Sequence, residues 1–136
     1  MNIFNTFLEV KMKIVCISAS NVVVAKKHSA STRVCEVISE MVHSESSSDT
    51  SVEIIPLIDY ELRSCRMCGK CLEAGNCVHD KAFNRIYAAL ESADALFVVC
   101  PHYAPFPSKM MILLEKLEEI CYLNWCQNNQ YHTVVY

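Results

Sequence analysis

The sequence predicts an α/β protein in which a parallel β-sheet lies between layers of helices. Three short hydrophobic runs, at 13–17, 52–58 and 95–100, have the length and composition of buried strands. A segment with hydrophobic residues at steps of three and four follows each run, and this is the spacing of one helical face. Because helices connect the successive strands, we expect the strands to run parallel.

Length and composition favour a single domain at 1–136, with 1–11 as an extension before Met12. The 136 residues are 52% hydrophobic and 20% charged, which is typical of a globular domain with a buried core. The net charge of -3 provides no broad basic surface, so we expect no nucleic-acid binding. No run approaches the roughly 18 apolar residues of a spanning helix, so we expect no membrane association.

The first strand, Lys13–Ile17, is a β-branched run that we expect to be fully buried. A loop rich in serine and threonine follows and leads into a helix, with Ser31 or Thr32 where an N-cap belongs. The hydrophobic residues of this helix that we expect to face the sheet are Val34, Val37, Ile38 and Met41.

The loop between the first strand and its helix has the components of an anion site. Helix N-terminal amides favour a negative group, and the hydroxyls of Ser20, Ser31 and Thr32 add donors. No acidic residue follows Ser31 or Thr32 at the position that would complete a capping box. Ordinary N-capping after a solvated loop explains the same residues equally well. The loop lacks the glycines of a dinucleotide motif or a P-loop, which argues against a nucleoside triphosphate.

The second strand candidate, Val52–Ile58, contains Pro56, which places the strand at a sheet edge or ends it there. The third strand, Ala95–Cys100, is the most hydrophobic, and we expect it to lie centrally. Between them, Asp80 is expected to cap a helix whose apolar face contains Phe83, Ile86, Tyr87 and Leu90.

Three prolines are expected to hold the segment Pro101–Pro107 in an extended path. Ser108 is then expected to cap the last helix. The residues expected on its inward face are Met110, Leu113, Leu114, Leu117 and Cys121. Those expected to face outward are Glu115, Lys116, Glu118 and Glu119.

Four of the nine cysteines lie within a loop at 65–77, with the spacing C-x2-C-x2-C-x5-C. Both glycines of the chain, Gly69 and Gly75, fall inside this loop, where a wrapped backbone needs conformations that a Cβ forbids. Four compressed thiolates suit a [4Fe-4S] cluster, and the metal ligands would be Cys65, Cys68, Cys71 and Cys77. Thiols without a metal are the second alternative, and zinc is the third.

The odd number of cysteines and the absence of an export signal indicate reduced thiols or metal ligands in a cytoplasmic protein. The cysteines outside the loop are expected to act as small hydrophobic residues; they are Cys16, Cys35, Cys100, Cys121 and Cys126.

In a parallel sheet of this kind, ligands bind at the carboxyl ends of the strands where the strand order reverses. The loops after the first and third strands would line that crevice. The chain resembles the NAD(P)H-dependent FMN reductase and iron-sulfur flavoprotein group of the flavodoxin-like superfamily over residues 12 to about 121. The resemblance rests on Ile17-Ser-Ala-Ser20, Ser31-Thr32, the compact cysteine motif and Cys100-Pro-His-Tyr-Ala-Pro105.

The resemblance implies a flavodoxin-like three-layer α/β/α fold with strand order 2-1-3. In such a fold the FMN phosphate would lie at Ser18, Ser20, Ser31 and Thr32. The isoalloxazine and ribityl groups would lie beside Pro101, His102, Tyr103 and Ala104. The four compact cysteines would ligate a [4Fe-4S] cluster. The chain ends where the fourth strand of the family would begin, so we expect a truncated sheet with an open edge and a homo-oligomer.

We therefore expect an FMN-dependent oxidoreductase or electron-transfer flavoprotein that uses NAD(P)H or a reduced carrier. Electrons would leave FMN singly through the cluster to a small-molecule or protein acceptor. The catalytic residues are unknown, because His102 and Tyr103 could either hydrogen-bond the flavin or simply pack. The alternative is a non-enzymatic metal-binding or interaction protein with a degenerate flavin site.

Overall fold

The computed structural model describes residues 12–24, 28–45, 49–102 and 106–128. Its sheet contains three parallel strands, β1 (Met12–Ser18), β2 (Thr50–Pro56) and β3 (Ala95–Val99), in the order β2-β1-β3. The predicted parallel sheet and its order 2-1-3 are confirmed. The expectation that the third strand lies centrally is wrong within the described part of the chain, where β1 has a neighbour on each side.

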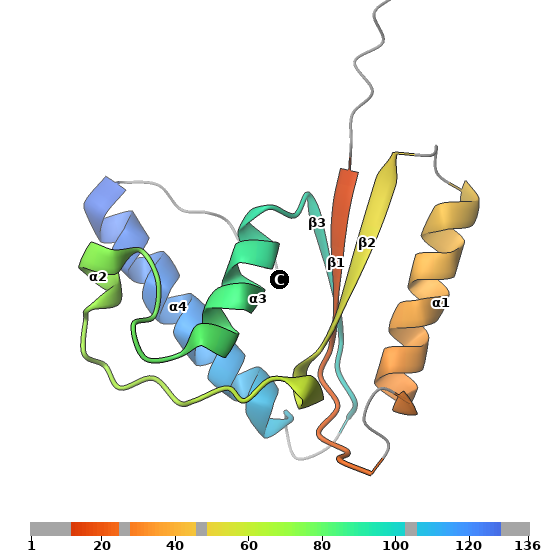
Figure 1. Ribbon diagram of the computed structural model, residues 1–136, viewed down its shortest axis with the longest axis horizontal. Coiled ribbons are helices and arrows are strands. Elements are labelled where there is room, and N and C mark those ends of the chain that lie inside the picture. The colour runs from red at the N-terminus through yellow and green to blue at the C-terminus, as the bar shows by residue number, and fades with distance from the viewer. Residues whose placement is uncertain (1–11, 25–27, 46–48, 103–105, 129–136) are drawn as a thin grey trace, which may run out of the picture.

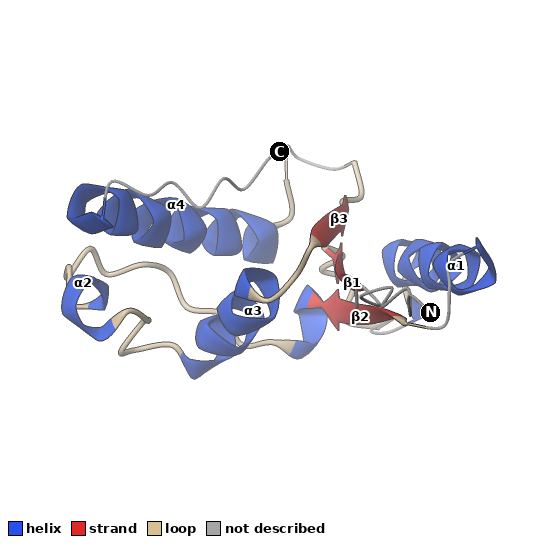
Figure 2. Ribbon diagram, turned by 90° about the horizontal axis from the view of Figure 1, so that it is seen from above, coloured by secondary structure: helices blue, strands red, loops and turns tan. Residues whose placement is uncertain are grey.

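Helices cover both faces of the sheet (Figures 1 and 2). Helix α1 (Ala30–Glu45) lies on one face, and α3 (Lys81–Glu91) and α4 (Ser108–Asn128) lie on the other. Successive residues of β1 alternate between these layers. Ile14 and Cys16 belong to the core under α1, whereas Val15 and Ile17 belong to the larger core under α3 and α4.

Two short helices link β2 to α3. The 3-10 turn η2 (Leu57–Asp59) follows β2 directly, and α2 (Cys71–Ala74) lies within the cysteine loop, against α4. None of the helices in the described ranges has the length and hydrophobicity needed to cross a membrane.

Helix α1 turns a different face to the sheet from the one predicted. Val34, Val37 and Met41 are 47%, 40% and 61% exposed, so the expectation that they face the sheet is wrong. Ile38 is partly buried, as expected, but the fully buried positions of α1 are Ser31, Thr32 and Cys35. Small side chains let the helix approach the strands closely, and the hydroxyls bond to one another, which offsets the cost of their burial.

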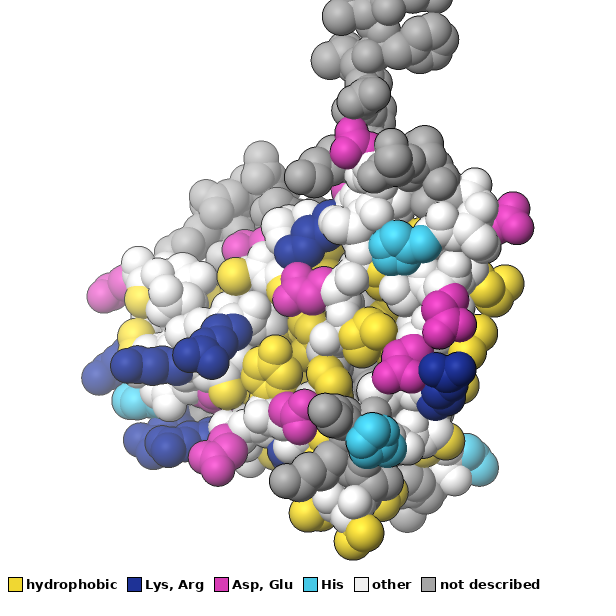
Figure 3. Space-filling view, turned by 45° about the vertical axis from the view of Figure 1, so that its right-hand side comes forward, with side chains coloured by type: hydrophobic (Ala, Val, Ile, Leu, Met, Phe, Trp, Pro, Cys, Tyr) yellow, Lys and Arg dark blue, Asp and Glu magenta, His cyan; other side chains and the backbone are white. Residues whose placement is uncertain are grey.

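The space-filling view of Figure 3 brings the right-hand side of Figure 1, where α1 lies, toward the reader. Hydrophobic side chains are visible there among acidic and basic ones. On this face the hydrophobic side chains lie mainly in the middle, with charged side chains around them.

Helix α3 is formed as predicted. Asp80 is its N-cap, and Oδ1 of Asp80 accepts a hydrogen bond of 2.9 Å from the backbone N–H of Phe83. Phe83, Ile86 and Tyr87 are buried, and Leu90 is partly buried.

Helix α4 is confirmed with two corrections. Its predicted core residues Met110, Leu113 and Leu117 are buried, with Leu114 and Cys121 packed at the margin. Ser108 is the first residue of the helix rather than its N-cap. Lys116 was expected to face outward but is only 4% exposed. Its burial depends on a partner distant in the sequence, described below.

Candidate functional site

The loop after β1 contains a cluster of buried hydroxyl groups. The hydroxyls of Ser18 and Thr32 are 2.9 Å apart, and those of Ser29 and Thr32 are 3.0 Å apart. Oγ of Ser29 also accepts a hydrogen bond of 3.2 Å from the Thr32 N–H, and the Ser29 carbonyl accepts one of 2.9 Å from the Arg33 N–H. Ser29 therefore caps α1, and the prediction of Ser31 or Thr32 as N-cap is wrong.

This arrangement divides the predicted anion-site residues into two groups. Ser18 and Thr32 bond to each other and hold the end of β1 against the start of α1. Ser20 and Ser31 are also buried, at 4% and 5% exposure, but lie outside that hydroxyl pair. Oγ of Ser20 accepts a hydrogen bond of 3.2 Å from the Val22 N–H, which shapes the loop after β1.

The loops after β1 and β3 meet at the carboxyl end of the sheet, as the sequence predicts. The Ala19 N–H donates a hydrogen bond of 3.0 Å to the Val99 carbonyl, so the first loop is joined to the end of β3. Asn21 donates through Nδ2 to Ser108 Oγ at 2.9 Å, which ties the same loop to the start of α4.

After β3, Pro101 is partly buried and His102 is exposed. Tyr103 and Ala104, which the resemblance assigns to the flavin site, lie outside the described residues. Cys100 stands between β3 and this segment, and burial raises the pKa of its thiol. The Cys100 thiol beside this segment is therefore neutral near pH 7.

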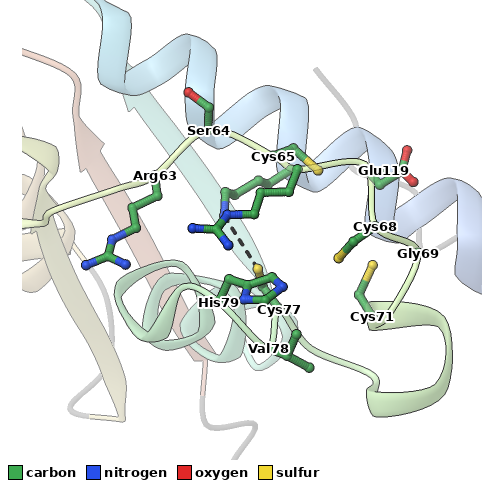
Figure 4. A pocket seen from close by; sticks show the side chains of 12 residues that line it. Arg63, Ser64, Cys65, Cys68, Gly69, Cys71, Cys77, Val78, His79 and Glu119 are labelled. Atoms are coloured by element: carbon green, nitrogen blue, oxygen red, sulfur yellow. Dashed lines mark hydrogen bonds between the residues drawn. The ribbon is translucent and has the colours of Figure 1, made fainter.

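The cysteine loop surrounds a pocket on the side of the molecule that carries α3 and α4 (Figure 4). All four predicted metal ligands line it. The other lining residues are Arg63, Ser64, Arg66, Gly69, Val78, His79, Lys116 and Glu119. Within the described ranges, however, no three His, Cys, Asp or Glu side chains are gathered closely enough to hold a metal ion. The structure thus brings the four cysteines to one pocket but not into a coordination cage.

Asp80 connects the start of this loop to α3 and α4. Its Oδ2 accepts hydrogen bonds of 2.9 Å both from the Arg63 N–H and from the Lys116 ammonium. Burial favours the neutral carboxyl of Asp80, but the hydrogen bonds from the Arg63 and Phe83 amides and from Lys116 outweigh it and lower its pKa. The side chains of Asp80 and Lys116 are 1% and 3% exposed, so they form a desolvated ion pair.

Cys77 holds the other end of the loop. Its N–H donates to Asn84 Oδ1 and its carbonyl accepts from Asn84 Nδ2, both at 2.8 Å. The Lys116 ammonium lies 3.5 Å from the Cys77 sulfur, the contact drawn as a dashed line in Figure 4, and 5.3 Å from the ring centroid of Phe83. The backbone and sulfur of Cys77 are therefore fixed by two helices.

Between these ends the loop turns sharply. Met67, Gly69 and Gly75 have positive φ angles of 51°, 66° and 67°. Glycine accepts this conformation without strain, whereas Met67 adopts it at a cost of about 1–3 kcal/mol. The predicted need for glycine in this loop is thus confirmed at both positions.

Three functional contacts were not predicted from the sequence. Ser29 is the N-cap, Lys116 is the buried cation, and Asn84 bonds to the backbone of Cys77. Ser29 carries a local signal, because it stands three residues before Thr32, the spacing of a hydroxyl cap and the amide it accepts. Lys116 and Asn84 carry no local signal, since their partners lie on other elements.

Comparison with known proteins identifies the family. The family model for NADPH-dependent FMN reductase matches residues 12–117, which include β1, α1, β2, α3, β3 and the first half of α4. Comparison with curated proteins and with solved structures gave no match. The matched range covers both loops at the carboxyl end of the sheet. The chain therefore belongs to the NADPH-dependent FMN reductase family, a group of oxidoreductases in the flavodoxin-like superfamily.

Proposed function

We propose that the chain is an FMN-dependent oxidoreductase that takes electrons from NAD(P)H and holds FMN between the loops after β1 and β3. The observation that carries the proposal is the buried hydroxyl loop at the carboxyl end of β1, within the range that matches the family. In open parallel sheets, ligands bind at this end of the strands.

The donor set fits the terminal phosphate of FMN. The first amides of a helix lack partners within the helix. Here Oγ of Ser29 takes the amide of Thr32, and the Arg33 N–H makes the first regular helical bond, to the Ser29 carbonyl. The amides of Ala30 and Ser31 and the hydroxyls of Ser20 and Ser31 are then the groups assigned to the phosphate. Ser18 and Thr32 keep the loop in shape through their mutual hydrogen bond.

In this proposal, Pro101 and His102 of the segment after β3 border the isoalloxazine ring and ribityl group of FMN. When bound, FMN supplies the hydride and single-electron chemistry. The part-buried Pro101 restricts the backbone beside the ring, and Cys100, with its raised pKa, keeps a neutral side chain there. These residues position the ring and limit its contact with water.

The [4Fe-4S] cluster is supported only by the cysteine spacing and by the shared pocket. The sulfur atoms do not form a cage within the described residues, so the arrangement does not fit a cluster as it stands. The proposed activity therefore does not pass electrons through one.

The decisive experiment compares FMN with riboflavin, which lacks the phosphate. We expect Ser31→Ala and Ser20→Ala each to weaken FMN binding by roughly ten- to a hundredfold, because a hydrogen bond to a charged group contributes about 1.5–3 kcal/mol. Riboflavin binding should not change, and Ser44→Ala, at the exposed far end of α1, is the matched control.

Flavin fluorescence titration gives the two affinities, and the loss of NADPH absorbance in the presence of FMN gives the activity. Equal binding of FMN and riboflavin by the wild-type protein would contradict the phosphate site. Tight FMN binding without NADPH oxidation would contradict the proposed reaction and leave a flavin-binding protein.

A further inference from the structure

We propose that Cys68 and Cys71 form a dithiol–disulfide site that reacts with small-molecule disulfides such as glutathione disulfide. This site is separate from the flavin site and does not depend on the proposed flavin activity. The inference starts from the disagreement described above, in which four cysteines share a pocket but are not arranged to hold a metal.

The geometry of the loop pairs these two cysteines. The two positive-φ residues Met67 and Gly69 flank Cys68, and the Leu72 N–H closes the turn with a hydrogen bond of 3.0 Å to the Gly69 carbonyl. As a result, the sulfur atoms of Cys68 and Cys71 point toward one another in Figure 4. A disulfide requires Cα atoms less than about 7 Å apart, a separation that two residues three apart in a tightly turned loop can adopt.

The other two cysteines are held by different contacts. Cys77 is fixed through its backbone by Asn84 and through its sulfur by Lys116. The sulfur of Cys65 accepts a hydrogen bond of 3.4 Å from the Met67 N–H, and the Cys65 N–H donates to Glu115 Oε2 at 3.3 Å. Both cysteines therefore already make hydrogen bonds that hold the loop in shape.

Exposure assigns the order of reaction. Cys68 is exposed, so a dissolved disulfide can reach its sulfur, whereas Cys71 is partly buried beside it. Arg66 lies on the same pocket, where its positive charge suits the carboxylates of glutathione disulfide. Cys68 is thus the attacking residue, and Cys71 is the resolving one.

The reaction balances as two successive exchanges. The deprotonated sulfur of Cys68 attacks one sulfur of the small disulfide, which forms a mixed disulfide and releases one thiol. The sulfur of Cys71 then attacks Cys68 of the mixed disulfide, which forms the Cys68–Cys71 bond and releases the second thiol. The protein loses two protons and two electrons, and the small disulfide gains both.

The test is to equilibrate the full chain with mixtures of reduced and oxidised glutathione, block free thiols and digest with trypsin. Cleavage after Arg63, Arg66, Lys70 and Lys81 separates the loop into peptides 64–66, 67–70 and 71–81. The first contains Cys65, the second Cys68, and the third both Cys71 and Cys77. The proposal predicts a disulfide between peptides 67–70 and 71–81.

Two variants identify the second sulfur. Cys77→Ser should leave the link between 67–70 and 71–81 intact, and Cys71→Ser should abolish it and leave glutathione attached to Cys68. The buried Cys16 and Cys35 serve as internal controls that stay reduced.

Three results would overturn the proposal: a link from peptide 64–66, loss of the link in Cys77→Ser, or loop thiols that stay reduced at high oxidised glutathione. Stoichiometric iron and sulfide in protein purified without oxygen, together with protection of Cys68 and Cys71, would also overturn it. None of these outcomes bears on FMN binding, so the failure of one proposal is distinguishable from the failure of the other.

Discussion

Replacing Asp80 by alanine should be among the most damaging single substitutions in the protein. The side chain accepts hydrogen bonds from the amides of Phe83 and Arg63 and from the ammonium of Lys116. Asp80→Ala removes all three and leaves Lys116 as an unpaired cation in a site where its side chain is only 3% exposed. Loss of one partner of a buried ion pair costs about 3–5 kcal/mol, and the lost helix cap contributes about 1 kcal/mol of that range.

Lys116→Met should cost less, about 1.5–3 kcal/mol, the usual contribution of a hydrogen bond to a charged group. Methionine fills a similar volume beside Phe83, and the Asp80 carboxylate keeps its two amide donors. The double variant Asp80→Ala/Lys116→Met should then be more stable than the sum of the single effects predicts, by roughly 1–3 kcal/mol.

Urea unfolding followed by circular dichroism measures these free energies, provided that the slope with denaturant stays constant. Lys81→Met, at an exposed position at the start of α3, is the control and should leave stability unchanged. Additive effects of the two substitutions would refute the reasoning, because they would mean that Asp80 and Lys116 do not interact in solution. A loss below about 1 kcal/mol for Asp80→Ala would refute it too.

Three further outcomes are expected. Folding lowers the pKa of the Asp80 carboxyl, so its contribution to stability is complete above its unfolded pKa of about 3.9 and is lost as the pH falls through the lower folded value. The free energy of unfolding of Asp80→Asn should therefore fall less steeply with decreasing pH than that of the wild-type protein. β3 lies at an edge of the sheet that the described residues form, and it exposes Phe97 by 43%. Phe97→Lys should therefore weaken the proposed self-association in sedimentation, with Val34→Lys on α1 as the control, and a wild-type monomer at all concentrations would contradict this. Iron and sulfide assays on anaerobically purified protein should give values well below one cluster per chain, and full occupancy that disappears in Cys68→Ala/Cys71→Ala would contradict this.

The sequence was sufficient where structure depends on neighbours along the chain. The β-branched run of β1 and the Asp80 cap of α3 are local features, and both were predicted correctly. The strand order 2-1-3 was predicted from the family resemblance and could not have come from periodicity, which carries no information about which strands pair.

The errors arose where polar residues are buried by partners that a local pattern cannot show. Hydropathy ranks Ser31, Thr32 and Lys116 as surface residues, yet all three are buried. The cost of burying the Thr32 hydroxyl is offset by its hydrogen bonds to Ser18 and Ser29. The cost of burying the Lys116 ammonium is offset by its ion pair with Asp80, which lies on a different element. In both helices the hydrophobic spacing correctly predicts a helix, but it cannot show which polar residues these partners bury.

The attachment of the cysteine loop at both ends has a consequence for how the segment can vary. Arg63 at its start and Cys77 at its end are bonded to residues of α3 and α4 or to the N-cap of α3. The intervening residues therefore connect two points that these helices already hold in place. Closing a flexible loop of twice the length costs only about 0.6 kcal/mol more. Residues 64–76 are therefore expected to accept insertions while the sheet and helices α1, α3 and α4 fold unchanged.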